Sequence, residues 1–307
     1  VQSLERKVRR AAAARGLNEA INWSFLPQKA ADAFGGGTWS LANPISEDMK
    51  VMRPSLLPGL LSAAQRNMDR GASSVRLFEI GRRYFAAADG TSDERLTAGI
   101  VLAGDRAVRN WATGKSAKFD AFDAKAEAIA LLKAAGVATD GLLVMDDAGA
   151  HYHPGQSATL RMGPKNILAA FGTLHPATAK AFDLDGSVVA AEIFLDAIPL
   201  KKATGFMRPA FTPPALQAVT RDFAFLVSQY TPANDLVRAI KGCDKDNIVA
   251  ARLFDRFAGQ GVPEGQVSLA VEITLQPTDK SYGDDDLKLI SDKVIAAAAK
   301  LGAVLRG

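Results

Sequence analysis

Cysteine and histidine are scarce in this chain of 307 residues, and their scarcity excludes several kinds of site. The single cysteine, Cys243, can form neither an internal disulfide nor a zinc cluster, so the sequence fits a reducing cytoplasm. We expect an unreactive thiol, buried or at a helix end. The three histidines are His151, His153 and His175. The turn-like sequence after His153 favours a structural role, and we assign no metal ligand.

Long apolar runs and catalytic motifs are also lacking. No stretch approaches the roughly 18 continuous apolar residues that a membrane-spanning helix needs, so we expect no membrane contact. The sequence has no Gly-x-Ser-x-Gly element, no Walker loop and no cysteine–histidine pair. We therefore assign no catalytic residue. Asp284, Asp285 and Asp286 directly precede an apolar helical pattern, which favours helix capping over a cation site.

Positive charge is present but unevenly placed. The net charge is +4, with 26 basic and 21 acidic residues before Thr212 and 11 basic and 12 acidic residues from Thr212 onward. The second part of the chain is thus nearly neutral. Any binding of nucleic acid there must depend on the local arrangement of side chains and not on bulk charge.

Apolar periodicity predicts an α+β chain with two domains. In the first, residues 1–200, most strands follow one another without helices between them, which predicts an antiparallel sheet with flanking helices. The expected helices are 3–15, 58–68 and 121–135, and the expected strands are 20–25, 75–85, 96–103, 142–145, 157–162, 167–174 and 188–195. A proline-rich stretch at 198–214 marks the boundary. The second domain, residues 212–307, has the order βαββαβ of a ferredoxin-like unit, with a strand over Ile248–Phe257.

Several short motifs resemble a known family. The second domain contains motifs that resemble the ferredoxin-fold anticodon-binding domain. They are VTRDFAFLV at 219–227, LFD at 253–255, GVPEG at 261–265 and SLA at 268–270. The first domain contains motifs that resemble a synthetase-like core. They are NPIS at 43–46, MRPSLLPGL at 52–60, LFEIG at 77–81, HPG at 153–155 and GTLHP at 172–176. The whole chain resembles the C-terminal region of the β subunit of bacterial phenylalanine-tRNA ligases. Its first residue is Val1 and not methionine, which suggests a fragment of a longer protein.

The resemblance implies a non-catalytic relative of the class II synthetase core. It also implies a catalytic α subunit as partner in an (αβ)2 enzyme, with ATP and magnesium serving the whole enzyme and no cofactor in this fragment. Arg76 and Glu79 loosely match the arginine and glutamate strand with which such enzymes bind ATP. The second ATP-binding arginine, after a glycine-rich apolar segment, is missing. Without it the phosphates lack their clamp, and we expect Arg76 and Glu79 to be structural.

The candidate contact with phenylalanine tRNA is the strand Ile248–Phe257. Period-two alternation places Arg252, Phe254 and Arg256 on one face and Val249, Ala251 and Leu253 on the other. A phenylalanine between two arginines on an open sheet could stack an unpaired base while the guanidinium groups meet phosphate. The alternative is that Phe254 packs on a neighbouring element and the arginines are merely solvated. Weaker candidates for tRNA contact are Arg221, Lys280 and Tyr282, each of which could instead serve a local ion pair or turn.

Two other functions remain open at this point. A stand-alone ATP-dependent ligase would bind ATP by itself, and the missing arginine argues against it. A structural assembly module without RNA binding is compatible with the near-neutral second domain. Salt-dependent binding of tRNA separates this module from an anticodon-binding subunit.

Overall fold

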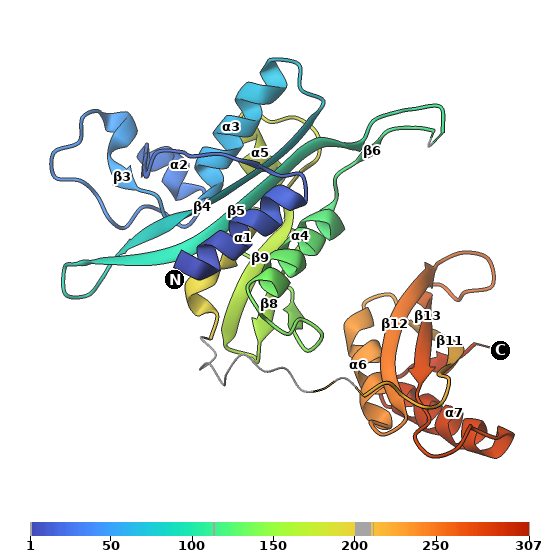
Figure 1. Ribbon diagram of the computed structural model, residues 1–307. Helices are drawn as coiled ribbons and strands as arrows, with labels where there is room; N and C mark the ends of the chain where they lie inside the picture. Colours follow the sequence, from blue (N-terminus) through green and yellow to red (C-terminus); the bar gives the residue numbers. More distant parts are fainter. Residues whose placement is uncertain (1, 113, 200–209, 211, 307) are drawn as a thin grey trace. The chain divides into compact units, whose positions relative to one another are not determined.

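The computed structural model describes residues 2–112, 114–199, 210 and 212–306. The chain divides into two compact units, Val1–Lys202 and Ala203–Gly307. The domain boundary expected at 198–214 falls mainly on residues outside this described part. Each unit has an apolar core of its own and is described by itself (Figure 1).

The first unit is built on a mainly antiparallel sheet with the strand order β1-β4-β5-β10-β9-β8-β7. These strands are β1 (Asn18–Glu19), β4 (Ser74–Ala86), β5 (Ser92–Ala107), β7 (Leu143–Met145), β8 (Tyr152–Met162), β9 (Asn166–Leu174) and β10 (Val188–Phe194). Strand β6 (Ala117–Lys118) pairs with β5, and β2 (Phe25–Leu26) pairs with β3 (Val51–Met52) in a separate ribbon. Only β1 and β4 pair in parallel among the described strands. The α+β class with antiparallel sheets is confirmed.

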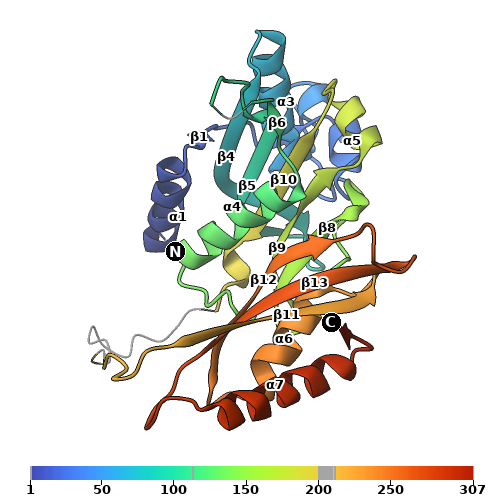
Figure 2. The ribbon, with the colours of Figure 1, turned by 90° about the vertical axis from the view of Figure 1, so that its right-hand side faces the viewer.

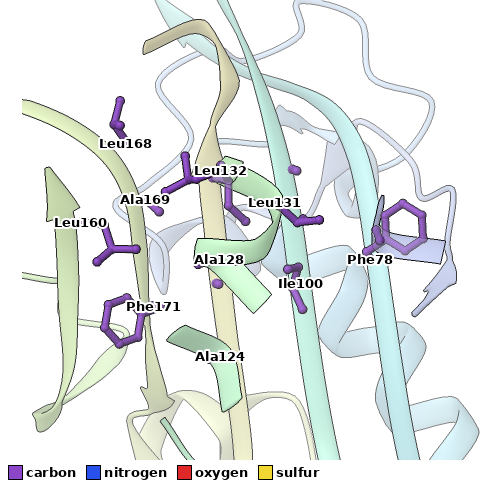
Figure 3. Packing of buried hydrophobic residues seen from close by; sticks show 14 of the residues in the cluster. Phe78, Ile100, Ala124, Ala128, Leu131, Leu132, Leu160, Leu168, Ala169 and Phe171 are labelled. Carbon is purple, nitrogen blue, oxygen red and sulfur yellow. The ribbon is translucent and has the colours of Figure 1, made fainter. Parts of the chain in front are cut away.

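Helices cover both faces of this sheet. Helices α1 (Gln2–Ala14) and α4 (Ala121–Ala134) pack on one face, and α3 (Leu57–Asp69) and α5 (Pro176–Ala181) on the other; α2 (Gln28–Asp32) is a short helix nearby. Along β5, Ile100 and Leu102 belong to the first core, whereas Val101 and Ala103 belong to the second. Figure 3 shows the α4 side chains lying over those of the sheet. The continuous apolar run of β5 therefore reflects burial on both faces.

Local signals set the ends of helix α4. The carboxylate of Asp120 accepts the backbone N–H groups of Phe122 at 2.8 Å and Asp123 at 3.1 Å, and the Asp123 carboxylate accepts the N–H of Asp120 at 2.9 Å. This reciprocal capping box satisfies donors that the first turn leaves unpaired. Gly136 follows the helix with φ of 91°, a conformation that glycine adopts without strain.

The strand expected over 20–25 is wrong. Only β1 and β2, at its two sides, are strands, and the segment between them is a loop. The Asn22 side chain donates to Glu79 Oε2 at 2.7 Å, and this contact holds the loop to the sheet. Ile21 is 92% exposed and Trp23 72% exposed. The alternation that predicted a strand is real, but Ile21 and Trp23 face solvent, and only Phe25 at its end pairs in a strand.

A buried ion pair lies beneath this loop. Arg53 Nη1 contacts Glu79 Oε1 at 2.6 Å, with side chains 6% and 4% exposed. Arg53 Nε also donates to the carbonyl of Arg82 at 3.0 Å. A side chain at Gly81 would collide with the Arg53 guanidinium and force it to shift. The pair thus connects the segment before α3, strand β4 and the 20–24 loop.

The second unit has the order βαββαβ that the sequence predicted. Its elements are β11 (Val219–Ser228), α6 (Ala233–Cys243), β12 (Ile248–Phe257), β13 (Gln266–Leu275), α7 (Asp284–Ala299) and β14 (Val304–Leu305). The sheet order is β12-β13-β11-β14, and both helices lie on one face of the sheet (Figure 2). Cys243 ends α6 as expected, and burial raises the pKa of its thiol. Asp286 accepts the Gly283 N–H at 3.1 Å, which confirms capping at the start of α7.

We predict that Arg53→Met lowers the free energy of unfolding by about 3–5 kcal/mol, because it leaves the Glu79 carboxylate buried without its cation. The double variant Arg53→Met, Glu79→Leu should lose less than the sum of the two single variants. Arg82→Met removes the exposed Arg82–Glu94 pair and should cost under about 1 kcal/mol. Urea unfolding measures all four variants, and equal losses for Arg53→Met and Arg82→Met would contradict the buried pair's importance.

Candidate nucleic-acid interface

The face of the second sheet opposite α6 and α7 is open. Residues directly across an antiparallel pair share a face, so the register assigns each side chain to one side. On β13, Leu269, Val271 and Ile273 belong to the buried core with the helices. The residues that alternate with them, including Ser268 and Ala270, therefore face the open side.

The grouping of Arg252, Phe254 and Arg256 on one face is wrong, because β12 is not regular. Its pairing with β13 shifts between Leu253, which lies opposite Val271, and Asp255, which lies opposite Ala270. Phe254 is thus the extra residue of a β-bulge, with no partner on β13. Beyond the bulge the alternation is reversed. Arg252 lies on the open side, opposite Glu272, whereas Arg256 lies opposite the core residue Leu269.

The remaining predicted residues are scattered. Arg221 lies opposite Ile273 and so falls on the helix side of the sheet, although it is exposed. Lys280 lies 3.3 Å from Asp286, and the Tyr282 hydroxyl donates to Asn247 at 2.9 Å. These two residues line a pocket of about 330 Å³ beside α7. Of the six predicted residues, the register therefore places Arg252 alone on the open face.

Arg252 is engaged in an exposed ion pair. Its Nε lies 2.7 Å from Glu272 Oε1. The hydrogen bond to Glu272 raises the pKa of Arg252, and the same bond lowers the pKa of Glu272. An exposed pair of this kind adds little stability, so a phosphate could compete with Glu272 for the guanidinium.

Two residues that the sequence analysis missed lie on the open face. Phe257 lies opposite Ser268 and is 40% exposed. The Arg306 N–H donates to the Ala224 carbonyl at 2.8 Å, which extends the β14 pairing and directs Arg306 to the same side. The Arg306 guanidinium lies 5.6 Å from the centre of the Phe257 ring. An aromatic ring and a guanidinium plane are the two surfaces on which proteins stack unpaired bases.

Small residues near Phe257 and Arg306 are the feature of the sequence that indicates the open face. Ala224, Ser268 and Ala270 occupy open-face positions, where Ala224 and Ala270 are half-buried and Ser268 is buried; their sequence neighbours Phe225 and Leu269 lie in the core on the other face. Gly259 also lies close to the Phe257 ring, where a side chain would collide with it. Larger residues, Asp222, Leu226 and Glu272, occupy other open-face positions of the same two strands. The bulge that decides the position of Phe257 leaves no such pattern.

The first unit contains a cavity of about 230 Å³ that both apolar and polar side chains line. Glu192 lines it and is fully buried, and burial raises the pKa of its carboxyl group. Arg83 is the one arginine or lysine in the described lining of the cavity; it donates to Thr97 Oγ1 at 2.7 Å, and its guanidinium lies 4.4 Å from the Phe194 ring centre. A single guanidinium that is already engaged cannot make the two-sided clamp that a triphosphate needs.

Arg76 and Glu79, which loosely match the ATP-binding strand of class II synthetases, make structural contacts. The Arg76 guanidinium lies 4.8 Å from the Phe119 ring centre and donates to the Arg106 carbonyl at 2.9 Å. Glu79 is paired with Arg53, as described above.

No helix within the described residues has the length and apolar character needed to cross a membrane.

Comparisons with known proteins identify both units. The model of the ferredoxin-fold anticodon-binding domain matches residues 214–306, which places the second unit in that class of domain. The model of the phenylalanyl-tRNA synthetase β chain CLM domain matches residues 1–195. The chain belongs to the phenylalanyl-tRNA synthetase β chain family.

Curated relatives agree with this family. The phenylalanine-tRNA ligase β subunit of Novosphingobium aromaticivorans is 68% identical, over 99% of this chain and 39% of the relative. That of Zymomonas mobilis is 56% identical, over 99% of this chain and 38% of the relative. The chain thus spans about two fifths of the length of these proteins. A solved pyrrolysyl-tRNA synthetase from Desulfitobacterium hafniense covers 64% of each chain at 17% identity and a TM-score of 0.49, too weak a likeness to bear on function.

We predict that His151, which lines the cavity of the first unit, makes stability depend on pH. Burial lowers its pKa from 6.5 to about 4. Between these values the unfolded chain binds a proton that the folded chain does not, so the free energy of unfolding falls by roughly 3 kcal/mol as the pH decreases through this window. His151→Gln should lack this loss, and the control His153→Gln should retain it. Urea unfolding at pH 7 and pH 4.5 measures the difference; the same pH dependence in both variants would refute the prediction.

Proposed function

We propose that this chain is the non-catalytic part of a phenylalanine-tRNA ligase β subunit that binds the anticodon region of phenylalanine tRNA. The open face of the second unit, with Phe257 and Arg306 on it, is the observation that carries the proposal. Unpaired anticodon bases stack on the ring and guanidinium while exposed cations meet phosphate. The match to an anticodon-binding domain model over residues 214–306 supports this assignment.

The first unit serves assembly in this proposal. It is a class II synthetase-like core that pairs with a catalytic α subunit in an (αβ)2 enzyme of the cytoplasm. ATP and phenylalanine bind to the α subunit, because the cavity here has a single engaged arginine, and magnesium serves the whole enzyme. By holding the anticodon end, the β subunit orients the tRNA so that its acceptor end reaches the partner's active site.

The residues predicted from the sequence take secondary roles. Arg252 exchanges Glu272 for a phosphate. Arg221 and Arg256 are exposed on the helix side of the sheet and Phe254 is exposed at the bulge, and the three contact the flanking nucleotides. Lys280 and Tyr282 line their own pocket by α7, where Lys280 offers a further phosphate contact.

A structural module without RNA binding is the second candidate. The pairing of Arg252 with Glu272 favours it, because that pair neutralises the one predicted cation on the open face. The two candidates differ in whether changes on the open face alter the affinity for RNA.

We predict that Phe257→Ala weakens binding of the anticodon stem–loop by about 1–3 kcal/mol, roughly 5- to 150-fold in Kd, because a stacked base loses its platform. Arg306→Ala should weaken binding and reduce its salt dependence. Fluorescence anisotropy with the labelled stem–loop, on the assembled enzyme, measures both.

Tyr230→Ala and Arg238→Ala are matched controls in the same unit. Tyr230 is 84% exposed in a turn, and Arg238 is exposed on α6, on the helix side of the sheet. Both should retain wild-type affinity. Wild-type affinity in Phe257→Ala and Arg306→Ala as well would leave only the structural module.

A further inference from the structure

The connection between β5 and β6 is a long hairpin that projects from the first unit (Figure 1). Asp105 pairs with Lys118 and Ala107 with Ala117. Near the tip, Asn110 and Gly114 exchange two backbone hydrogen bonds of 3.2 and 2.9 Å. The hairpin therefore has defined backbone structure on both sides of its turn.

The base of the hairpin is anchored to the sheet. The Asp105 N–H donates to the Ser73 carbonyl at 2.8 Å. Arg76 donates to the Arg106 carbonyl at 2.9 Å, while its guanidinium lies over the ring of Phe119. These contacts fix the direction in which the hairpin leaves the first unit.

An aromatic side chain and two uncompensated cations lie near the tip. Trp111 is 98% exposed. Arg106 lies 3.5 Å from Asp123, and Lys118 lies 2.7 Å from Asp105. Arg109 and Lys115, which flank the turn, are exposed and have no ion pair within the part of the chain that the structure describes. The hairpin thus presents an indole between two positive charges that form no ion pair with any described residue.

We propose that this hairpin is a second RNA-binding element, which stacks an unpaired nucleotide of the tRNA on Trp111 and contacts the adjacent phosphates through Arg109 and Lys115. Charge complementarity favours RNA over an apolar protein groove, because burying the two cations in such a groove would carry a desolvation cost. A base offers the indole a π-face and brings the phosphates that the cations require. The proposal rests on the proposed function, since it adds a contact outside the anticodon.

The test uses the complete β subunit assembled with its α partner and full-length phenylalanine tRNA. Trp111→Ala should raise Kd about tenfold, and Trp111→Phe should restore most of the affinity because a phenyl ring still stacks. Arg109→Ala, Lys115→Ala should lower the slope of log K against log salt by roughly 1 to 2. None of these variants should change binding of the isolated anticodon stem–loop, which the second unit holds.

Matched controls lie on the same unit. Trp23→Ala removes another exposed tryptophan, without flanking cations, and Arg70→Ala, Lys180→Ala removes two exposed cations elsewhere. All controls should bind tRNA as the wild type does. Thermal melting of each variant separates loss of binding from loss of folding.

The outcomes distinguish this proposal from the function on which it rests. Wild-type affinity in the Trp111 and Arg109–Lys115 variants, together with weakened binding in Phe257→Ala, overturns the hairpin contact alone. Unchanged tRNA affinity with impaired α association in Trp111→Ala identifies a protein contact and also overturns it. If neither Phe257→Ala nor the hairpin variants affect binding, both proposals fail.

Discussion

The register between antiparallel strands is the constraint on which the proposed interface depends. Because side chains alternate, one inserted residue moves every later side chain to the other face. The bulge at Phe254 makes this exchange in β12, so that Phe257 reaches the open face and Arg256 leaves it. The same backbone pairing continues through β11 to Arg306 and brings a guanidinium over the Phe257 ring. Backbone hydrogen bonds thus assemble the site from the two opposite edge strands of the sheet, β12 and β14.

The two units use their sheets in different ways. The first sheet is covered by helices on both faces, so its apolar strands serve the core. Its polar residues are largely engaged with one another, as Arg53 with Glu79 and Arg83 with Thr97. The second sheet has both of its helices on one side and leaves the other for a ligand. The proposed division of labour, with assembly in the first unit and RNA binding in the second, rests on this difference.

The sequence predicted the regular elements well and the site less well. Strands and helices with clear periods, such as β9 and α4, lie within a residue or two of their expected ends. The strand predicted over 20–25 was wrong because Ile21 and Trp23 alternate with polar residues as in a strand but are exposed. A hydrogen bond from Asn22 to the distant Glu79 holds this segment as a loop. Bulges and cross-strand ion pairs depend on partners far along the chain. For that reason the pairing of Arg252 with Glu272 and the position of Phe257 could not be read from the sequence.

Photo-cross-linking tests the central claim most directly. Phenylalanine tRNA carrying a photoreactive uridine in the anticodon loop would be irradiated in complex with the enzyme, and the linked peptides identified by mass spectrometry. The account predicts cross-links to the end of β12 at Phe257 and to the residues around Arg306. Cross-links confined to α6 and α7, or to the first unit, would contradict an anticodon site on the open face of the sheet.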